Sequence, residues 1–101
     1  MGAYMYILRC ADDSFYVGST TDIERRLFQH NEGKGAAYTR RPGRRPVELA
    51  YVAEFDSIVE AFGYEKQVQG WSRAKRQALI DGRYELLPGL ATKSFGDSGD
   101  R

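Results

Sequence analysis

The chain has 101 residues, which is enough for one compact domain and too few for two. With 42% apolar and 29% charged residues it has the composition of an ordinary soluble globular protein, and its size limits the core. The net charge of +1 does not by itself indicate a nucleic-acid-binding protein, and the single cysteine, Cys10, excludes an internal disulfide, a cysteine-based zinc site and a CxxC redox motif. No segment resembles a signal peptide or approaches the length of a membrane span, so we expect a cytoplasmic protein.

The N-terminal segment predicts an antiparallel β-hairpin. Residues 4–10 (YMYILRC) are aromatic and aliphatic, residues 15–20 (FYVGST) form a second such run, and turn residues separate them. If Cys10 pairs with Tyr16, then Tyr6 and Tyr16 lie on one face, whereas a slip of one residue separates them.

A first helix is predicted after the hairpin. Thr21 and Glu24 have the spacing of a capping box, with Thr21 as the N-cap. We expect the helix to continue to about Glu32, where Gly33 ends it.

The side chains of this helix form two stripes. Ile23 and Leu27 are four residues apart and are expected to face the core. Arg26 and His30 are also four residues apart and form a neighbouring stripe.

Residues 33–46 are rich in Gly, Arg and Pro and predict a loop, within which a short ordered stretch at residues 36–39 is compatible with the pattern. The loop carries a run of basic residues with no acidic residue among them, namely Lys34, Arg40, Arg41, Arg44 and Arg45. Such a cluster attracts phosphates even when the rest of the chain neutralises it. A solvated basic loop is the other interpretation.

The second half of the chain predicts one strand and two helices. Residues 47–55 (VELAYVAEF) alternate as a strand does, and Ser57 caps a helix that ends near Gly70. Ser72 caps a further helix that ends near residue 82.

The predicted fold is therefore α/β (α+β), a small three-stranded antiparallel sheet flanked by about three helices in the order ββαβαα. The domain is expected to span residues 1–90, and residues 91–101, which are polar and contain glycine, are expected to be a disordered tail.

The second helix carries a carboxylate on an apolar stripe. Its members follow helical spacing and are Ile58, Ala61, Phe62, Glu65 and Val68. A charge on a core-facing stripe is costly unless it is paired, bound to a metal or open to a cleft. Glu65 is therefore a candidate functional residue, or else it lies at the edge of the stripe and is salt-bridged to an arginine.

Residues 4–82 resemble the GIY-YIG nuclease superfamily, especially its small stand-alone single-domain (UPF0213-like) members. The resemblance rests on two tyrosine triplets, YMY at residues 4–6 and YVG at 16–18, on a helix with Arg26 and then His30, and on the later YEKQ segment that contains Glu65. The first triplet departs from the GIY of the family name. Many catalytic members also carry an asparagine near the end of the domain, whereas the only Asn here is Asn31.

The resemblance implies a metal-dependent endonuclease that cuts phosphodiester bonds, of DNA rather than RNA, with low sequence specificity. Glu65 would hold one Mg²⁺ or Mn²⁺, weakly in the absence of substrate. Arg26 would contact the phosphate, and one tyrosine would act on the attacking water, with Tyr6 preferred as the base and Tyr16 as the orienting group. His30 would accept a proton or orient a tyrosine.

Further contacts to nucleic acid are expected outside this group. Gly18 would let the substrate backbone come close because it has no side chain. The basic loop and the third helix would grip the backbone without reading sequence, through Lys34, Arg40, Arg41, Arg44, Arg45, Arg73 and Arg76.

Other interpretations stay open. Tyr6 and Tyr16 are also acceptable as core aromatics, Arg26 as a surface residue, and His30 as a structural histidine. The chain as a whole is alternatively a nucleic-acid-binding module with weak or no cleavage, which the missing asparagine favours, or an adaptor that a protein partner targets. The oligomeric state is open.

Overall fold

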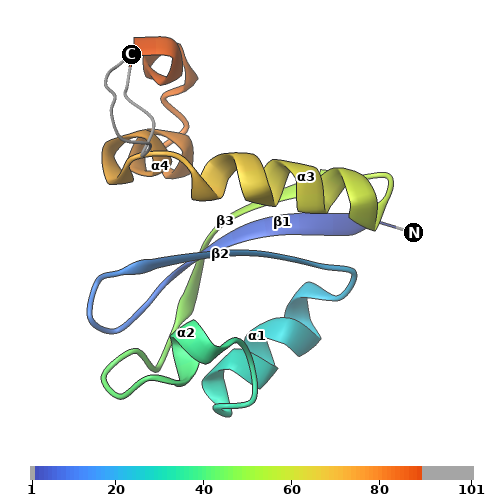
Figure 1. The fold of residues 1–101 in the computed structure, drawn as a ribbon, viewed down its shortest axis with the longest axis vertical. Helices are drawn as coiled ribbons and strands as arrows, with labels where there is room; N and C mark the ends of the chain where they lie inside the picture. Colours follow the sequence, from blue (N-terminus) through green and yellow to red (C-terminus); the bar gives the residue numbers. More distant parts are fainter. Residues whose placement is uncertain (1, 90–101) are drawn as a thin grey trace. The chain divides into compact units, whose positions relative to one another are not determined.

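The computed structural model describes residues 2–89, which fall into two compact units divided between Glu65 and Lys66 (Figure 1). The predicted tail at residues 91–101 lies outside the described residues. None of the helices within residues 2–89 is both long and apolar enough to cross a membrane.

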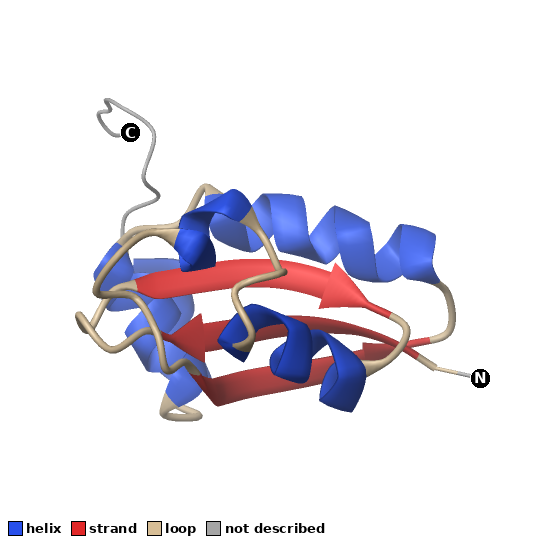
Figure 2. Cartoon of the chain, turned by 90° about the horizontal axis from the view of Figure 1, so that it is seen from below, coloured by secondary structure: helices blue, strands red, loops and turns tan. Residues whose placement is uncertain are grey.

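The secondary structure confirms the predicted α+β class (Figure 2). The elements in chain order are β1 (Ala3–Arg9), β2 (Phe15–Thr20), α1 (Ile23–Asn31), α2 (Ala37–Arg40), β3 (Glu48–Phe55), α3 (Ile58–Gln69), α4 (Arg73–Ile80) and a 3₁₀ helix η1 (Tyr84–Gly89). The short helix α2 coincides with the stretch for which local order was compatible with the sequence, and η1 was not predicted.

The three strands form one antiparallel sheet in the order β2-β1-β3. In the hairpin, Leu8 pairs with Tyr16 and Tyr6 pairs with Gly18, so the pairing of Cys10 with Tyr16 is wrong by two residues. A shift of two residues preserves the face of every side chain. Tyr6 and Tyr16 therefore lie on the same face, as the predicted pairing required.

The central strand β1 supplies both faces of the sheet. Tyr6 and Leu8 pack in one cluster with Ile23 and Leu27 of α1, which confirms that these helix residues face the core. Figures 1 and 2 show α1 and α2 on this side of the sheet and residues 58–65 of α3 on the other. Met5 alternates with Tyr6 and is fully buried, so it faces the α3 side.

The ends of α1 are set by local chemistry. The N-cap is Asp22, whose carboxylate accepts a hydrogen bond from the Arg25 amide at 3.1 Å, so the prediction of Thr21 was wrong by one residue. The carboxylate of Asp22 satisfies an amide of the first turn, and its own amide donates to the Thr20 hydroxyl at 3.1 Å. Gly33 follows the C-cap with φ of +78°, as the predicted stop requires.

The serine caps of the other helices are confirmed. The Ser57 hydroxyl accepts from the Glu60 amide at 3.2 Å, and the Ser72 hydroxyl accepts from the Lys75 amide at 3.1 Å.

The apolar stripe of α3 is narrower than predicted. Ala61, Glu65 and Val68 are buried, whereas Ile58 and Phe62 are 43% and 50% exposed. At about 100° per residue the three buried positions fall within roughly 60° of the helix circumference, and the other two lie beside that arc. Glu65 therefore lies at the end of the buried arc that is nearer to Ile58 and Phe62, and it is buried there.

Candidate active site

A series of hydrogen bonds among buried side chains links β1, through α1, to α2. The Tyr6 hydroxyl lies 2.9 Å from His30 Nε2, and His30 Nδ1 lies 2.7 Å from Thr39 Oγ1. The Thr39 hydroxyl donates in turn to the Ala36 carbonyl at 3.1 Å. Tyr6, His30 and Thr39 are all buried, so bulk solvent does not reach the hydrogen bonds between them.

Tyr16 completes an aromatic group around His30. Its ring centroid lies 6.3 Å from that of Tyr6, 5.2 Å from that of His30 and 5.8 Å from that of Tyr38. The two predicted site tyrosines and the only histidine of the chain are therefore brought together.

Arg26 reaches this group from one turn earlier in α1. Its guanidinium lowers the pKa values of both Tyr6 and Tyr16, although the desolvation of the two phenols outweighs this effect. A further hydrogen bond runs from Arg26 Nη1 to Gln29 Oε1 at 3.1 Å. The arginine is half-buried, so its charge acts on the tyrosines while it still borders solvent.

Glu65 approaches from the other face of the sheet. The Ser19 hydroxyl donates to Glu65 Oε1 at 2.6 Å, and Ser19 neighbours Gly18 on β2 with its side chain on the opposite face. Because β2 is an edge strand, groups from the two faces can meet around that edge. The charge of Glu65 acts on both Tyr6 and Tyr16 and raises their pKa values, which shows that they are close.

Burial controls the protonation of the group. Desolvation is the largest effect on Tyr6 and raises its pKa to about 12, and desolvation also raises the pKa of Tyr16. Desolvation followed by the charge of Arg26 lowers the pKa of His30 to about 4. At neutral pH the resting site therefore contains neutral tyrosines and a neutral imidazole.

An open cleft of about 450 Å³ follows the end of β2. Its lining comes from both faces of the sheet, with Ser19 and Ile58 on one side and Arg25, Arg26 and Gln29 of α1 on the other. Arg26 therefore links the buried aromatic group to solvent-accessible space.

Gly18 has a structural reason to lack a side chain. A Cβ at this position would lie 2.6 Å from the Tyr6 hydroxyl oxygen and 3.0 Å from Cε2 of Tyr16. The glycine makes room for the two tyrosines, whereas its predicted role in letting substrate approach stays a prediction.

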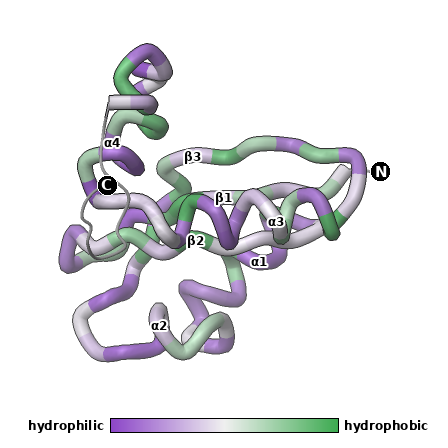
Figure 3. The backbone as a smooth tube through the Cα atoms, turned by 45° about the horizontal axis from the view of Figure 1, so that its top comes forward, coloured by the Kyte–Doolittle hydropathy of each residue, from purple (hydrophilic) through white to green (hydrophobic). Residues whose placement is uncertain are grey.

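The predicted basic residues of the loop are not equivalent. Lys34, Arg40, Arg41 and Arg45 are exposed. Figure 3 colours the segment between α2 and β3 largely hydrophilic, as its arginines require. This part of the loop is available to a charged partner.

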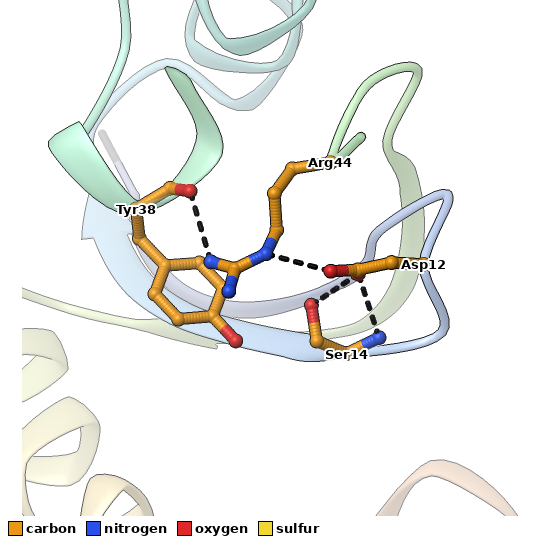
Figure 4. Close-up of polar contacts among 4 residues, drawn as sticks. All are labelled: Asp12, Ser14, Tyr38 and Arg44. Carbon is orange, nitrogen blue, oxygen red and sulfur yellow. Dashed lines mark hydrogen bonds and ion pairs between the residues drawn. The ribbon is translucent and has the colours of Figure 1, made fainter. Parts of the chain in front are cut away.

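Arg44 differs because its guanidinium is engaged within the protein (Figure 4). It stacks 3.8 Å above the Tyr38 ring centroid, donates to the Tyr38 carbonyl at 3.1 Å, and pairs with Asp12 at 2.7 Å. Hydrogen bonds from Ser14, then Arg44, hold the pKa of the Asp12 carboxyl at about 2. Arg44 thus joins the loop to the hairpin turn.

In the second unit, Arg73 is exposed and Arg76 is half-buried. Arg76 donates from Nε to the Val68 carbonyl at 3.2 Å and from Nη2 to the Gln69 carbonyl at 2.8 Å. It therefore caps the C-terminal end of α3, a structural role that the sequence did not indicate.

Two polar residues of the site were missed by the sequence reasoning. Ser19 was noted only as part of the strand, and Thr39 only as part of a locally ordered stretch. A buried threonine in a basic loop gives no local signal, because its partner His30 is nine residues away. Asn31, the only asparagine, is structural: its side chain exchanges two hydrogen bonds with the backbone of Val47, at 2.7 and 3.2 Å.

The residues present are compatible with a weakly held divalent cation. Within residues 2–89, no group of three or more His, Cys, Asp and Glu side chains is arranged to hold a metal ion. Glu65 is a buried carboxylate oriented by Ser19, and an ionised carboxylate has about four lone-pair positions. Mg²⁺ commonly binds through one or two carboxylates, waters and substrate phosphates, so Glu65 satisfies the protein's share of such a site.

Comparison with known proteins identifies the family. Residues 2–78 match the model of the GIY-YIG catalytic domain. The chain is 47% identical over 77 residues to a UPF0213 protein of Natronomonas pharaonis, which covers 76% of this chain and 88% of that protein.

Two solved structures share the fold. The solution NMR structure of the UPF0213 protein from Bacillus halodurans has a TM-score of 0.51 and 43% identity, and covers 84% of this chain and 92% of that one. The solution NMR structure of a protein from E. faecalis has a TM-score of 0.56 and 38% identity, with coverage of 84% and 88%. The chain therefore belongs to the GIY-YIG catalytic domain family, and its relatives include the small UPF0213 proteins that its combined motifs predicted.

Proposed function

We propose that this protein is a metal-dependent endonuclease that cuts phosphodiester bonds of DNA with low intrinsic sequence specificity. Membership of a nuclease-type domain family supports the reaction class. The observation that carries the proposal is the convergence of two tyrosines, an arginine, a histidine and a glutamate around the edge of β2, beside an open cleft.

Arg26 and Glu65 are suited to the charged groups of the reaction. The guanidinium of Arg26 borders the cleft and would donate to the scissile phosphate, where negative charge develops. Glu65, oriented by Ser19, would hold one Mg²⁺ or Mn²⁺. When bound, that cation would supply positive charge to the phosphate oxygens and the leaving oxygen.

Tyr6 and His30 are suited to moving one proton. The attacking water would give a proton to the Tyr6 oxygen while the Tyr6 hydroxyl gives its own proton to His30 Nε2, which lies 2.9 Å away. This concerted transfer avoids a free phenolate, which the raised pKa of Tyr6 disfavours. Tyr16 would orient the water and the phosphate from its place beside both rings.

The exposed basic residues support backbone contact without base recognition. Lys34, Arg40, Arg41 and Arg45 would neutralise phosphates outside the reacting group, and Arg73 would add a further contact. Arg44 and Arg76 would contribute indirectly, because their guanidinium groups already bind within the protein. Contacts of this kind predict little sequence specificity.

The test compares the protein with Glu65→Gln, and with Glu60→Gln as a control on an exposed position of the same helix. Each is incubated with end-labelled single-stranded, duplex and branched DNA, and with RNA, in the presence of Mg²⁺, Mn²⁺ or EDTA. We expect metal-dependent cutting of DNA by the protein and by Glu60→Gln, and at least a 100-fold loss in Glu65→Gln. Equal cutting by Glu65→Gln would reject the proposed site, and cutting of RNA alone would reject the substrate.

A nucleic-acid-binding module is the second candidate, and one observation favours it. The only asparagine, Asn31, binds the backbone of Val47 and does not supply the asparagine that many catalytic relatives carry. Binding of DNA by all three proteins without cutting by any of them would establish this alternative. Cutting that appears only with an added cellular protein would support targeting by a partner.

A further inference from the structure

The helix α2 contacts the candidate site through two consecutive residues. Tyr38 packs against Tyr16 with ring centroids 5.8 Å apart, and Thr39 bonds to His30 at 2.7 Å. Thr39 is fully buried, so its hydroxyl must find its partners within the protein.

The hydroxyl of Thr39 has one proton and two close neighbours. Its oxygen lies 3.1 Å from the Ala36 carbonyl oxygen and 2.7 Å from His30 Nδ1. A carbonyl only accepts, so the hydrogen bond between Thr39 and Ala36 uses the hydroxyl proton. The contact with His30 must then be a hydrogen bond that Nδ1–H donates and Thr39 Oγ1 accepts.

The Tyr6 end of this series of hydrogen bonds indicates the same direction of donation. The positive guanidinium of Arg26 acts on Tyr6, and this favours a lone pair of the phenol oxygen on that side over its proton. The Tyr6 proton is then best donated to His30 Nε2 at 2.9 Å. In a neutral imidazole, protonation of Nδ1 leaves Nε2 as the acceptor, so the two ends agree.

We infer that Thr39 is a positioning residue: it fixes His30 as the Nδ1–H tautomer and thereby leaves Nε2 to accept the proton of Tyr6. The tautomer follows from the hydrogen bonds alone, whereas its use in cleavage rests on the proposed function. Thr39 would act on the reaction through His30, without touching the substrate.

The surroundings of His30 keep its ring in one orientation. A Cβ at Gly35 would lie 2.9 Å from Cγ of His30 and 3.0 Å from its Cα, so the backbone at Gly35 packs directly against the imidazole. The opposite tautomer would leave the Thr39 and Ala36 oxygens without a proton between them. It would also leave the buried Tyr6 hydroxyl without the acceptor that Nε2 provides at 2.9 Å.

The experiment uses the fact that His30 is the only histidine. In full-length protein labelled with ¹⁵N-histidine, two-bond ¹H–¹⁵N correlation spectra at pH 7 distinguish the two tautomers, since the lowered pKa keeps the ring neutral there. We expect the Nδ1–H tautomer in the protein, in Thr39→Ser, which keeps the hydroxyl, and in Tyr6→Phe, which keeps Thr39. Thr39→Val should shift His30 toward Nε2–H.

The same variants test the consequence for cleavage. We expect kcat to fall roughly 10- to 100-fold in Thr39→Val with KM little changed, and to recover in Thr39→Ser. An Nε2–H tautomer in the unmodified protein, or an Nδ1–H tautomer retained in Thr39→Val, would overturn the inference. If Thr39→Val does not fold, the spectra of the protein and of Tyr6→Phe still test the inference. Loss of the Nδ1–H tautomer in Tyr6→Phe would show that Tyr6, and not Thr39, sets the tautomer.

The two proposals fail separately. If no protein cuts DNA but the tautomers behave as expected, the nuclease proposal is rejected and the assignment to Thr39 stands. If the protein cuts DNA and Thr39→Val cuts equally well, Thr39 has no positioning role and the nuclease proposal stands.

Discussion

The two sides of strand β2 place similar chemistry in different environments. On the side of α1 and α2, Tyr6, His30 and Thr39 are buried and joined by hydrogen bonds. Around the edge of the strand, Ser19 and Arg26 border an open cleft, and Ser19 orients Glu65. The closed side is suited to holding and moving a proton, and the open side to meeting charged groups from solvent.

The two environments separate proton transfer from the binding of charged groups within one small sheet. Desolvation on the closed side moves the pKa values of Tyr6 and His30 away from neutrality in opposite directions, so neither group ionises by itself. Groups on the open side keep access to ions and phosphates. Alternation of side chains along β2 supplies both environments from neighbouring residues.

The largest expected effect falls on the open side. Arg26→Lys keeps the charge but loses the planar fork of donors, so we expect kcat for DNA cleavage to fall roughly 100- to 1,000-fold. Arg25→Lys, at the neighbouring position of the same cleft, serves as the matched control and should lose less than tenfold. Equal losses in the two variants would show that the cleft needs only charge.

The closed side should make stability depend on pH. The pKa of His30 is about 4 in the folded protein and about 6.5 in the unfolded chain, so the unfolded chain binds more protons between these values. The free energy of unfolding should therefore rise by up to about 3 kcal/mol between pH 4 and pH 6.5, and then level off. Urea unfolding at a series of pH values measures this free energy.

His30→Gln is the control for this pH dependence. The variant should be less stable at pH 7 and should lose most of the slope between pH 4 and 6.5, because the glutamine at position 30 does not titrate. An unchanged slope would assign the effect to the carboxylates.

Substitutions at two glycines compare a tightly packed position with an open one. Gly18→Ala would put a Cβ 2.6 Å from the Tyr6 hydroxyl oxygen, and we expect it to lower the free energy of unfolding by about 1–3 kcal/mol. Gly63→Ala, in the middle of α3 with no atom within 4 Å of the new Cβ, should raise it by up to about 1 kcal/mol. Thermal or urea unfolding compares the pair, and a tolerated Gly18→Ala would mean that the tyrosines can move.

The smallest expected effect concerns the basic loop. Arg44→Ala removes the cation–π contact and the pairing with Asp12 and should cost about 1 kcal/mol of stability. Arg41→Ala, at an exposed position, should change stability by less than about 0.5 kcal/mol and should weaken DNA binding instead. Reversed effects in urea unfolding and in DNA-binding titrations would contradict the division of the loop into structural and binding residues.

Local patterns were sufficient for the elements and for much of the candidate site. Aromatic and aliphatic runs predicted β1 and β2, alternation predicted β3, and serine caps marked the starts of α3 and α4. The tyrosine triplets, the Arg26 and His30 helix and the Glu65 segment together predicted the family. The cap of α1 was misplaced because Thr21 and Asp22 are both good caps, and only the backbone geometry distinguishes them.

The rest depended on contacts between distant residues. Ser19 and Glu65 are 46 residues apart, and Arg44 and Asp12 are 32 apart, so no spacing rule connects them. The helical stripe left open whether Glu65 is buried or at the edge, and its partner followed only from which face of β2 carries Ser19. The exposure of Ile58 and Phe62 shows that periodicity defines a face without defining its width.

The pairing of Asn31 with Val47 has a consequence for engineering. Its two hydrogen bonds close the segment between α1 and β3 at its base, as the stem of a hairpin does. Lengthening such a closed segment at its tip adds little entropic cost, since the cost grows only with the logarithm of length. Residues 41–43 are exposed, and Gly43 has open space around it, so insertions there would extend the reach of the protein toward a bound strand while the sheet beneath keeps its register.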